Sequence, residues 1–519
     1  MLQSINNNRI LLVFIVPFLL GCISVLSFQP FNFTLVNFVI FPIIFHILCE
    51  INKKSKSIYR KKPYLINLFF VGYIFGIGFF LSGTYWISNS LNYDENFKSL
   101  IPFTIILLPL LLGLFFGFAT LTSGPFLKKN LYSLIFFCTI FSLFDYIRSK
   151  IFSGFPWNLW SYSWSWFTEI LQILNPLGLF TFNLLSIILF SLPCVFFLKQ
   201  TKYKLLILLS SFLLFFLNYI YGNYIINKNN LIIEKALSKN EHIDIKIVSP
   251  NFDMKYNLDG DEIDKRLKRL IKLSDPDLNK KTIFIWPEGV LSGKFYSDFL
   301  DYKSLFKKSF SKNHLVVLGT NTVDQNNKIY NSFLVINNKI DKLFQYNKIK
   351  LVPFGEFLPM QEIFENYGLK KITEGMGSFS SGKINKLYNY KDLSILPLIC
   401  YEIIFPELIQ KSNFNNLIIN ISEDAWFGDT IGPSQHFSKT IFRAIENDTY
   451  VIRSANKGVS AIINNKGQVI KTLKSNESGN LEYKLPIIQK RTNYRNDLIF
   501  FSLLFTNIFI FIYYKKNEK

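Results

Sequence analysis

The feature of this sequence that most constrains its fold is a series of long apolar runs without internal breaks. An apolar run of about 18 residues is long enough to cross the roughly 30 Å hydrocarbon layer of a membrane. Six clear runs span residues 10–28, 31–49, 64–88, 100–124, 177–198 and 205–222, and two weaker runs span 131–147 and 498–514. With a mean hydropathy of +0.23, the chain is too apolar for an ordinary soluble protein of 519 residues.

The part of the chain between residues 223 and 497 has a different character. No run there approaches the length needed to cross a membrane, and charged residues are dense. A segment of about 250 residues suits one large α/β unit. We therefore predict seven membrane helices within residues 1–225, an extramembrane domain over 240–488 and a last membrane helix over 496–515.

Lysine and arginine residues concentrate on alternate connections between the apolar runs. They precede the first run, follow the last one, and fill the connections 50–63, 125–130 and 199–204. The opposite short connections contain only Lys98, Arg148 and Lys150. Because short cytoplasmic loops carry an excess of Lys and Arg, this pattern predicts cytoplasmic termini and, after seven crossings, an extracytoplasmic domain. The net charge of +21 does not indicate nucleic-acid binding, since no basic cluster is interleaved with RNA-type aromatic residues.

The five cysteines are distributed unevenly. Cys22, Cys49, Cys138 and Cys194 lie in or beside the apolar runs, and only Cys400 lies in the predicted extramembrane domain. That domain therefore has no internal disulfide, and a lone thiol in an oxidising compartment must be buried or used. A buried small hydrophobic residue is the simpler alternative to a functional thiol. Cys22 ends a loose match to a lipoprotein signal box, "FLLGC", but the apolar run that follows at once favours a membrane anchor.

Strand-like and helix-like segments alternate in the predicted domain. Two charged amphipathic helices are predicted over 262–274 and 436–448. The strand-like segments are 243–251, 281–289, 314–321, 331–338, 392–400, 415–424 and 459–470. This pattern predicts covered sheets whose chemistry lies on the loops at strand ends.

Three polar residues follow such strands and form a chemically complete set. Glu288 follows "IFIWP", Lys348 follows the strand-like "KLFQY", and Cys400 ends "ILPLI". Glu288 can take the proton that turns a thiol into a thiolate, and Lys348 can lower the thiol pKa and hold an oxyanion. Buried charges are costly unless paired, so we expect Glu288, Lys348 and Glu356 to form one network. Singly, each is more simply a solvated surface residue, and only their order and apolar settings indicate a site.

Several motifs resemble those of a known family. "WPEG", "YNKIKLVPFGEF" and "ICYEIIFPE" resemble the three signatures of the carbon–nitrogen hydrolase (nitrilase) superfamily. The "LVPFGE" form, with "NISEDAWFGDTIGPSQHF" (420–437) and "RSANKGVSAIIN" (453–464), more specifically resembles the apolipoprotein N-acyltransferase family. In the membrane half, "FQPFNF" (28–33), "GIGFFLSGTYWI" (76–87) and "SGFPWNLWSYS" (153–163) extend the resemblance to nearly the whole chain. It implies a multi-pass α-helical membrane bundle of eight spans with an α/β nitrilase-like sandwich domain.

The resemblance also implies roles for individual residues. The base of the family falls on Glu288, its lysine on Lys348 and its nucleophile on Cys400. The positions that support catalysis fall on Glu356, Tyr401 and Glu402, and two substrate-binding positions fall on Tyr256 and Trp426. Two positions depart from the family pattern: Tyr256 stands where Trp is frequent, and Glu423 stands where Asn is usual.

The activity of that family implies substrates and a location. Its members transfer an acyl chain from a phospholipid to the α-amino group of the N-terminal diacylglyceryl-cysteine of an apolipoprotein. We therefore expect a phospholipid donor, an apolipoprotein acceptor, a bacterial inner-membrane location with a periplasmic catalytic domain, and a monomer. We expect no nucleic-acid partner and no cofactor. We expect no metal either, because His46, His242, His314 and His436 lack the spacing of metal ligands.

Other functions remain open from the residues alone. A membrane-tethered amidase or nitrilase acting on a small amide is the first, because the three signatures do not exclude it. A transporter with an accessory domain is the second, although transporters place ionisable residues mid-span and show internal repeats, which this sequence lacks. A catalytically inactive binding module is the third. A protease dyad of Cys400 with His436 is a weaker alternative.

Overall fold

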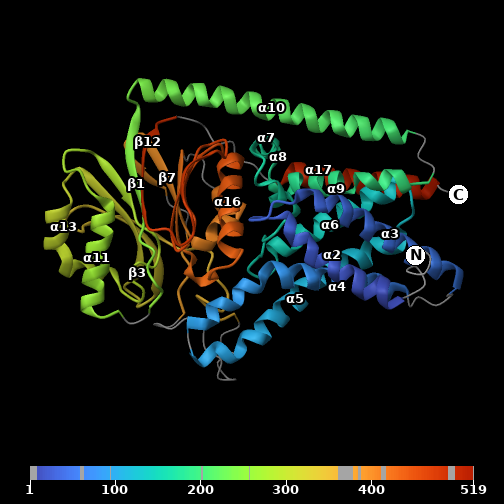
Figure 1. Cartoon of the computed structure of the whole chain (residues 1–519), viewed down its shortest axis with the longest axis horizontal. Coiled ribbons are helices and arrows are strands. Elements are labelled where there is room, and N and C mark those ends of the chain that lie inside the picture. Colours follow the sequence, from blue (N-terminus) through green and yellow to red (C-terminus); the bar gives the residue numbers. More distant parts are fainter. Residues whose placement is uncertain are drawn as a thin grey trace. The chain divides into compact units, whose positions relative to one another are not determined.

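The chain forms two compact units in the computed structural model (Figure 1). The structure describes residues 9–58, 64–93, 95–199, 203–255, 258–359, 378–383, 387–410, 416–488 and 497–517. Unit 1 consists of residues 1–88, 100–223 and 495–519, and unit 2 consists of residues 89–99 and 224–494. The short segment 89–99 therefore belongs to unit 2, although it lies between two apolar helices in the sequence.

Unit 1 contains helices and no strand among its described residues. Its α-helices are α2 (Val16–Ser24), α3 (Asn37–Ile58), α4 (Tyr64–Thr84), α5 (Ile101–Ser123), α6 (Leu131–Lys150), α7 (Thr168–Leu171), α8 (Leu174–Leu177), α9 (Leu179–Ser191), the first part of α10 (Lys204–Ser238), and α17 (Leu498–Asn517). Short helical turns extend or join them: η1 (Leu11–Ile15), η2 (Val25–Ser27), η3 (Thr34–Val36), η6 (Gly124–Phe126), η7 (Trp160–Trp164) and η8 (Leu192–Phe197). The turns η4 (Tyr85–Tyr93) and η5 (Glu95–Leu100) lie mostly in the segment 89–99 that belongs to unit 2.

Several of these helices are long and apolar enough to cross a membrane. Within the described residues, seven segments meet that criterion by length and composition. They are Thr34–Lys53, Tyr64–Tyr93, Phe97–Phe126, Leu131–Lys150, Leu179–Phe197, Lys204–Ser238 and Leu498–Asn517. The remaining apolar run of the sequence, 10–28, forms the shorter apolar segment Leu11–Ser27.

Small residues and one buried ion pair hold unit 1 together. Gly72 of α4 lies so close to α5 that a Cβ atom there would be 2.2 Å from the Phe116 carbonyl oxygen, a close approach that only glycine permits. Asp145, the charged residue of the weaker run 131–147, pairs with Arg148 at 2.9 Å. The Arg148 guanidinium also donates to the carbonyls of Phe155 (2.6 Å) and Trp157 (2.8 Å). Pairing explains how that helix tolerates a buried carboxylate.

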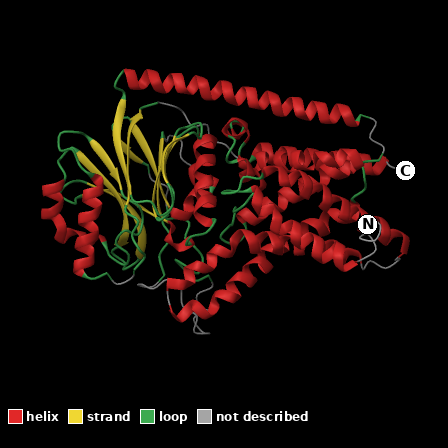
Figure 2. Cartoon of the chain, viewed as in Figure 1, coloured by secondary structure: helices red, strands yellow, loops and turns green. Residues whose placement is uncertain are grey.

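Unit 2 is built on two six-stranded sheets, shown as yellow strands in Figure 2. The first has the order β12-β1-β2-β3-β4-β5 and the second the order β11-β10-β9-β8-β7-β6. The strands are β1 (His242–Ser249), β2 (Thr282–Ile285), β3 (His314–Val323), β4 (Ile329–Ile336), β5 (Lys342–Asn347), β6 (Tyr388–Tyr390), β7 (Leu393–Ile399), β8 (Leu417–Glu423), β9 (Tyr450–Asn456), β10 (Ser460–Ile463), β11 (Val469–Leu473) and β12 (Gly479–Pro486).

The core of unit 2 lies between the sheets. Buried isoleucines from both sheets form one cluster, for example Ile245 and Ile285 with Ile399 and Ile421. A second cluster joins the opposite face of the first sheet to α11, and α16 packs against β9 and β10 of the second sheet. Unit 2 is therefore a sandwich of two sheets covered by helices (Figure 1). Its helical elements are α11 (Gly260–Ser274), α12 (Tyr296–Phe299), η9 (Leu300–Tyr302), α13 (Lys303–Ser309), η10 (Cys400–Ile404), α15 (Pro406–Gln410), η11 (Asp424–Phe427) and α16 (Gly432–Asn447).

Parallel strands at the centre of each sheet determine where polar residues gather. The neighbours β1, β2 and β3 are parallel, as are β7, β8 and β9. Glu288 follows the carboxyl end of β2, Cys400 that of β7, and Asp424 that of β8. Loops at the carboxyl ends of parallel strands lie at the same edge of a sheet, which is where an α/β protein usually has its site.

The fold differs from the sequence-based prediction at several places, among them strands β6 and β12, which no predicted strand covers. The single strand predicted over 459–470 is a hairpin, because residues 464–468 turn between β10 and β11 and Gly467 adopts φ +78°. Strand β9 was not predicted, since its residues "YVIRSAN" include a central arginine, Arg453, that breaks the apolar pattern. Helix α10 continues beyond the predicted span 205–222 to Ser238, and its Ile233 joins the core of unit 2.

Candidate active site

Glu288 is a buried carboxyl group held by three separate elements. It follows β2 directly after Trp286 and Pro287. Its Oε1 accepts a 2.7 Å hydrogen bond from the Asn331 side chain of β4, and its Oε2 accepts a 3.1 Å bond from the backbone N–H of Glu423. Burial raises the pKa of Glu288 above its ordinary value, although the Lys348 ammonium opposes the rise. A carboxyl group with a raised pKa is suited to act as a general base.

Lys348 is a buried cation between two carboxylates. It follows β5 and is 2% exposed. Its Nζ lies 2.8 Å from Glu356 Oε1 and 3.7 Å from Glu288 Oε1. Burial favours the neutral amine, but the charges of Glu356 and Glu288 outweigh it and raise the pKa of Lys348, so the side chain stays protonated. Glu356 is itself fixed, because it also accepts from Asn331 Nδ2 (2.9 Å) and from the Val352 N–H (2.9 Å). The expected network of Glu288, Lys348 and Glu356 is therefore present in the structure.

Cys400 stands where β7 ends and η10 begins. Its φ of +49° is in the left-handed region, which costs a residue with a side chain roughly 1–3 kcal/mol and often marks a functional turn. The thiol is buried, and burial together with the Glu288 charge raises the pKa of Cys400, whereas the Lys348 charge lowers it. The three predicted residues are thus near enough for their charges to interact. Cys400 is a thiol at rest, and it needs a base to become a nucleophile.

Glu402 joins the Cys400 turn to the Lys348 loop. It is fully buried, and its Oε1 accepts from the Tyr346 hydroxyl (2.8 Å) and from the backbone N–H groups of Ile349 (2.7 Å) and Lys350 (3.1 Å). Its Oε2 accepts from the Ile399 N–H at 2.8 Å. Tyr401 packs edge-on against Phe405 with ring centroids 5.0 Å apart. Glu402 has a structural position in this site, because four donors from the Cys400 turn and the Lys348 loop hold its carboxyl group.

Comparison with known proteins identifies the family. Residues 20–192 match the apolipoprotein N-acyltransferase N-terminal domain, and residues 282–488 match the carbon–nitrogen hydrolase domain. The apolipoprotein N-acyltransferase of Rickettsia prowazekii is 33% identical over 91% of this chain and 92% of its own length. That of Allorhizobium ampelinum is 29% identical over 88% of this chain and 87% of its own length. The chain belongs to the apolipoprotein N-acyltransferase family.

A solved structure also matches part of this apolipoprotein N-acyltransferase family member. An amidase of the nitrilase superfamily from Nesterenkonia AN1 is 15% identical, covers 48% of this chain and 92% of its own chain, and has a TM-score of 0.35. The carbon–nitrogen hydrolase match and the two covered sheets together make unit 2 a nitrilase-like α/β domain.

The two predicted substrate-binding residues have different outcomes. Trp426 lies in η11, where its ring meets that of Tyr93 edge-on at 5.5 Å. The Tyr93 hydroxyl also donates to the Ala425 carbonyl at 2.7 Å, and Asn89 donates to the Phe427 carbonyl at 2.9 Å. The segment 89–99 therefore supports the turn that carries Trp426. Tyr256 lies outside the described residues.

Glu423 is integrated into the site. Besides the N–H that it donates to Glu288, its side chain accepts from Asn456 Nδ2 (2.9 Å to Oε2) and from the Ala425 N–H (3.0 Å). Burial and the neighbouring carboxylates Glu288 and Asp424 raise the pKa of Glu423 well above its ordinary value. The buried Glu423 side chain is thus accommodated by hydrogen bonds rather than by exposure to solvent.

Sequence analysis missed two groups of residues at the site. Asn331, which bridges Glu288 and Glu356, is a polar residue in the strand-like "NSFLVINN", and only the pairing of β4 with β5 shows its role. A second cluster contains Asn420, Ser422, Asp424, His436 and Arg453. Four of these five residues lie in the motif 420–437, so that motif could have indicated them. No feature of the sequence predicted that Arg453 contacts this motif.

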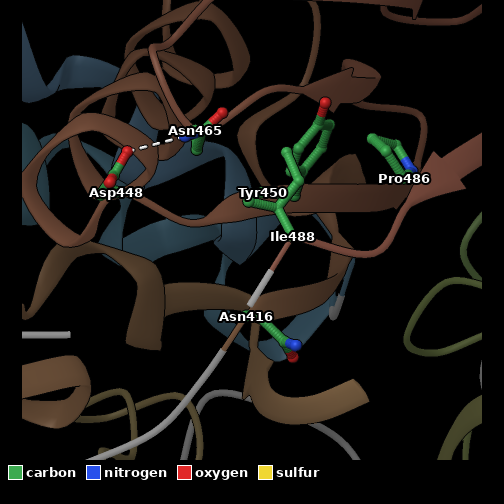
Figure 3. Close-up of a pocket in the computed structure, with 6 residues that line it drawn as sticks. All are labelled: Asn416, Asp448, Tyr450, Asn465, Pro486 and Ile488. Atoms are coloured by element: carbon green, nitrogen blue, oxygen red, sulfur yellow. Dashed lines mark hydrogen bonds between the residues drawn. The ribbon is translucent and has the colours of Figure 1, made fainter. Parts of the chain in front are cut away.

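Alternative sites receive less support. His436 lies 3.1 Å from Asp424 Oδ1 and 3.0 Å from the Arg453 guanidinium, which makes it a member of that cluster. Within the described ranges, no group of three His, Cys, Asp or Glu side chains is arranged to hold a metal ion. A separate pocket of about 10 Å³, enough for one water molecule, is shown in Figure 3. It is lined by Asn416, Asp448, Tyr450, Asn465, Pro486 and Ile488.

Proposed function

We propose that this protein transfers an acyl chain from a membrane phospholipid to the α-amino group of the N-terminal diacylglyceryl-cysteine of apolipoproteins. The observation that carries the proposal is the match to apolipoprotein N-acyltransferases over 91% of the chain, the apolar unit included. A small-amide amidase would need no such apolar unit. The buried set of Glu288, Lys348, Glu356 and Cys400 supplies the chemistry for acyl transfer through a thioester.

The first half-reaction loads the acyl group onto Cys400. Glu288 takes the thiol proton, and the thiolate attacks the ester carbonyl of the phospholipid. Lys348, together with a backbone N–H near Tyr401, stabilises the oxyanion of the tetrahedral intermediate. The carbon–oxygen bond to glycerol then breaks, and Glu288 returns its proton to the departing lysophospholipid. The products are a lysophospholipid and an acyl thioester on Cys400.

The second half-reaction transfers the acyl group to nitrogen. The neutral α-amine of the lipoprotein cysteine attacks the thioester carbonyl, and Glu288 takes the proton that the new amide nitrogen loses. The carbon–sulfur bond breaks, and the Cys400 thiolate recovers a proton from Glu288. An amide is more stable than a thioester, so the transfer is downhill and requires neither a nucleotide nor a metal.

The membrane arrangement is part of the same proposal. Eight spans would consist of the seven long apolar helices and the segment Leu11–Ser27. The basic connections favour cytoplasmic termini, and the catalytic domain, residues 240–488, would then be periplasmic in the bacterial inner membrane. Residues 1–225 and 496–515 would form the membrane domain of a monomeric enzyme, with Trp426 and Tyr256 near the bound substrates.

Labelled phospholipid tests the proposal directly. Purified protein incubated with phospholipid carrying a labelled acyl chain should accumulate an acyl group that hydroxylamine removes, and Cys400→Ser should not. Adding a diacylglyceryl-cysteine peptide should move the label to the peptide amine. If Cys400→Ser acquires as much hydroxylamine-labile label as the wild type, the assignment of the nucleophile is wrong. If the loaded enzyme releases free fatty acid and ignores the peptide, a hydrolase replaces the proposed function.

A further inference from the structure

The second buried cluster lies directly behind the proposed nucleophile. Asn420 and Ser422 stand at alternate positions of strand β8, so their side chains share one face of the sheet. Asp424 directly follows the strand and accepts a hydrogen bond from Ser422. The parallel register pairs Leu398 with Asn420 and Ile399 with Ile421. The next residues along the two chains, Cys400 and Ser422, therefore follow side by side. The mechanism proposed above assigns no role to this cluster.

Asn420 fixes the backbone of the Cys400 turn. Its Nδ2 donates to the carbonyls of Leu398 (3.2 Å) and Cys400 (3.4 Å). Its Oδ1 accepts from the Arg453 guanidinium of β9. The Asn420 amide thus connects the backbone of Cys400, which has a positive φ, to the Arg453 guanidinium on β9. The side chains of all three residues are buried.

Asp424 and Arg453 form a fully buried ion pair that anchors this connection. Arg453 donates to both carboxylate oxygens of Asp424, at 3.0 and 2.7 Å, and His436 of α16 lies 3.1 Å from Asp424 Oδ1. Burial opposes the charge on Asp424, but Arg453 and His436 outweigh it and hold the pKa of Asp424 well below its ordinary value. Burial lowers the pKa of His436 to about 4, so the histidine is neutral at physiological pH. The cluster therefore contains one anion and one cation, which compensate each other.

Ser422 connects this cluster to the sulfur atom. Its hydroxyl donates to Asp424 Oδ1 at 2.7 Å, and Ser422 stands beside Cys400 in the strand register, where it lowers the pKa of the thiol. A hydroxyl has a single proton that can rotate between two acceptors. If it turns from Asp424 to the sulfur, Asp424 still keeps Arg453 as a donor, so no buried acceptor loses its last partner.

We propose that Ser422 donates a hydrogen bond to the Cys400 thiolate, and that Asp424, Arg453 and Asn420 are positioning residues for Ser422 and the nucleophile. When Glu288 takes the thiol proton, the Ser422 hydroxyl rotates from Asp424 to the sulfur, and no proton leaves Ser422. When the thioester forms, the hydroxyl returns to Asp424. The inference rests on the proposed role of Cys400 as the nucleophile. It adds Ser422 to the site, beside the nucleophile Cys400, the base Glu288 and Lys348.

The titration of Cys400 tests this inference without any lipid. The rate at which iodoacetamide alkylates Cys400 in the purified full-length protein is measured by mass spectrometry of the Cys400 peptide, between about pH 6 and pH 10. Ser422→Ala should move the midpoint of the profile to higher pH and slow alkylation below the midpoint about tenfold. Ser422→Thr, which keeps the hydroxyl, should retain the wild-type profile. The ultraviolet absorbance of the thiolate gives the same titration when the spectrum of the Cys400→Ala protein is subtracted. This measurement does not depend on whether iodoacetamide can reach the sulfur.

Asp424→Asn should move the midpoint of the Cys400 titration in the opposite direction from Ser422→Ala. The titratable groups facing Cys400 are Glu288, Lys348 and Asp424, and the Asp424 charge disfavours the thiolate. Removing that charge and leaving Arg453 unpaired should move the midpoint to lower pH. A purely structural disturbance would not move the two variants in opposite directions. Equal midpoints for wild type and Ser422→Ala would overturn the inference. Normal titration without thioester formation would instead count against the proposed function.

Discussion

At the scale of single residues, the site is organised by buried carboxyl groups whose surroundings differ. Lys348 pairs closely with Glu356 at 2.8 Å and less closely with Glu288 at 3.7 Å. Glu288 is therefore the more available of the two to exchange a proton, and Glu356 keeps the ammonium in place. Glu402 has no cation among its hydrogen-bond partners, and only neutral donors satisfy it. The burial of Glu402 should therefore change how the stability of the protein depends on pH.

The stability of the protein should depend on the protonation of Glu402. Burial raises the pKa of Glu402 from 4.5 to about 7. Between these two values the folded chain retains a proton that the unfolded chain has lost, so this group makes folding less favourable as pH rises through that window. Glu402→Gln, which cannot ionise, should lack this slope. Thermal unfolding in detergent, compared for the two proteins from about pH 4.5 to about pH 7.5, checks the prediction. Parallel curves would contradict it.

Lys348→Met should disable the site and also weaken the fold. Glu288 and Glu356 would then share a buried space without their cation, which costs about 3–5 kcal/mol in comparable buried pairs. Loss of oxyanion stabilisation should slow thioester formation about a hundredfold or more. Lys350→Met is a matched control, since that lysine is partly exposed and its ion pair with Glu407 is long, at 3.7 Å. A similar loss of thioester formation in both variants would argue against a specific role for Lys348.

At the scale of elements, the decisive feature is the turn from β7 into η10. Cys400 adopts φ +49° there, held by Asn420 from β8 and by Glu402, which accepts the N–H of Ile399. The left-handed conformation costs residues other than glycine roughly 1–2 kcal/mol. Neighbouring strands thus stabilise a backbone conformation that the turn alone would not favour.

Glycine at position 400 should consequently be more stable than alanine. Both Cys400→Gly and Cys400→Ala lack the thiol, so the comparison concerns the backbone alone. Cys400→Gly should have the larger free energy of unfolding by about 1 kcal/mol, measured by thermal or denaturant unfolding in detergent. A glycine variant less stable than the alanine variant would show that the turn carries no strain.

The sequence predicted elements well where a periodic pattern was uninterrupted, and less well where tertiary contacts decide. The runs that became β1, β3, β4, β7 and β8 were recognisable because apolar residues predominate in them, either in alternation or in short runs. Strand β9 was hidden by Arg453, whose charge is neutralised only by Asp424, 29 positions away in the sequence. The same reason applies to the site. Glu288, Lys348 and Cys400 each stand in a local motif, whereas Asn331 and Arg453 acquire their partners only through strand pairing.

At the scale of the whole molecule, the question is how membrane-bound substrates reach one sulfur atom. The proposed function requires the catalytic domain to face the compartment in which exported apolipoproteins lie. The basic connections, the seven long apolar helices and the segment Leu11–Ser27 all bear on that orientation. The shorter segment matters most, because whether it crosses the membrane decides on which side the first residues lie.

Labelling of single cysteines would determine the orientation. In a chain with the five native cysteines replaced by serine, we expect Lys280→Cys to react with a membrane-impermeant maleimide in cells with a permeabilised outer membrane. Lys53→Cys and Lys516→Cys should react only after lysis, because the positive-inside pattern places both in the cytoplasm. Arg9→Cys should also be protected if Leu11–Ser27 crosses the bilayer. Labelling of Arg9→Cys in unlysed cells, with Lys53→Cys still protected, would reduce the eight spans to seven. Protection of Lys280→Cys would place the catalytic domain in the cytoplasm and remove the acceptor from its reach.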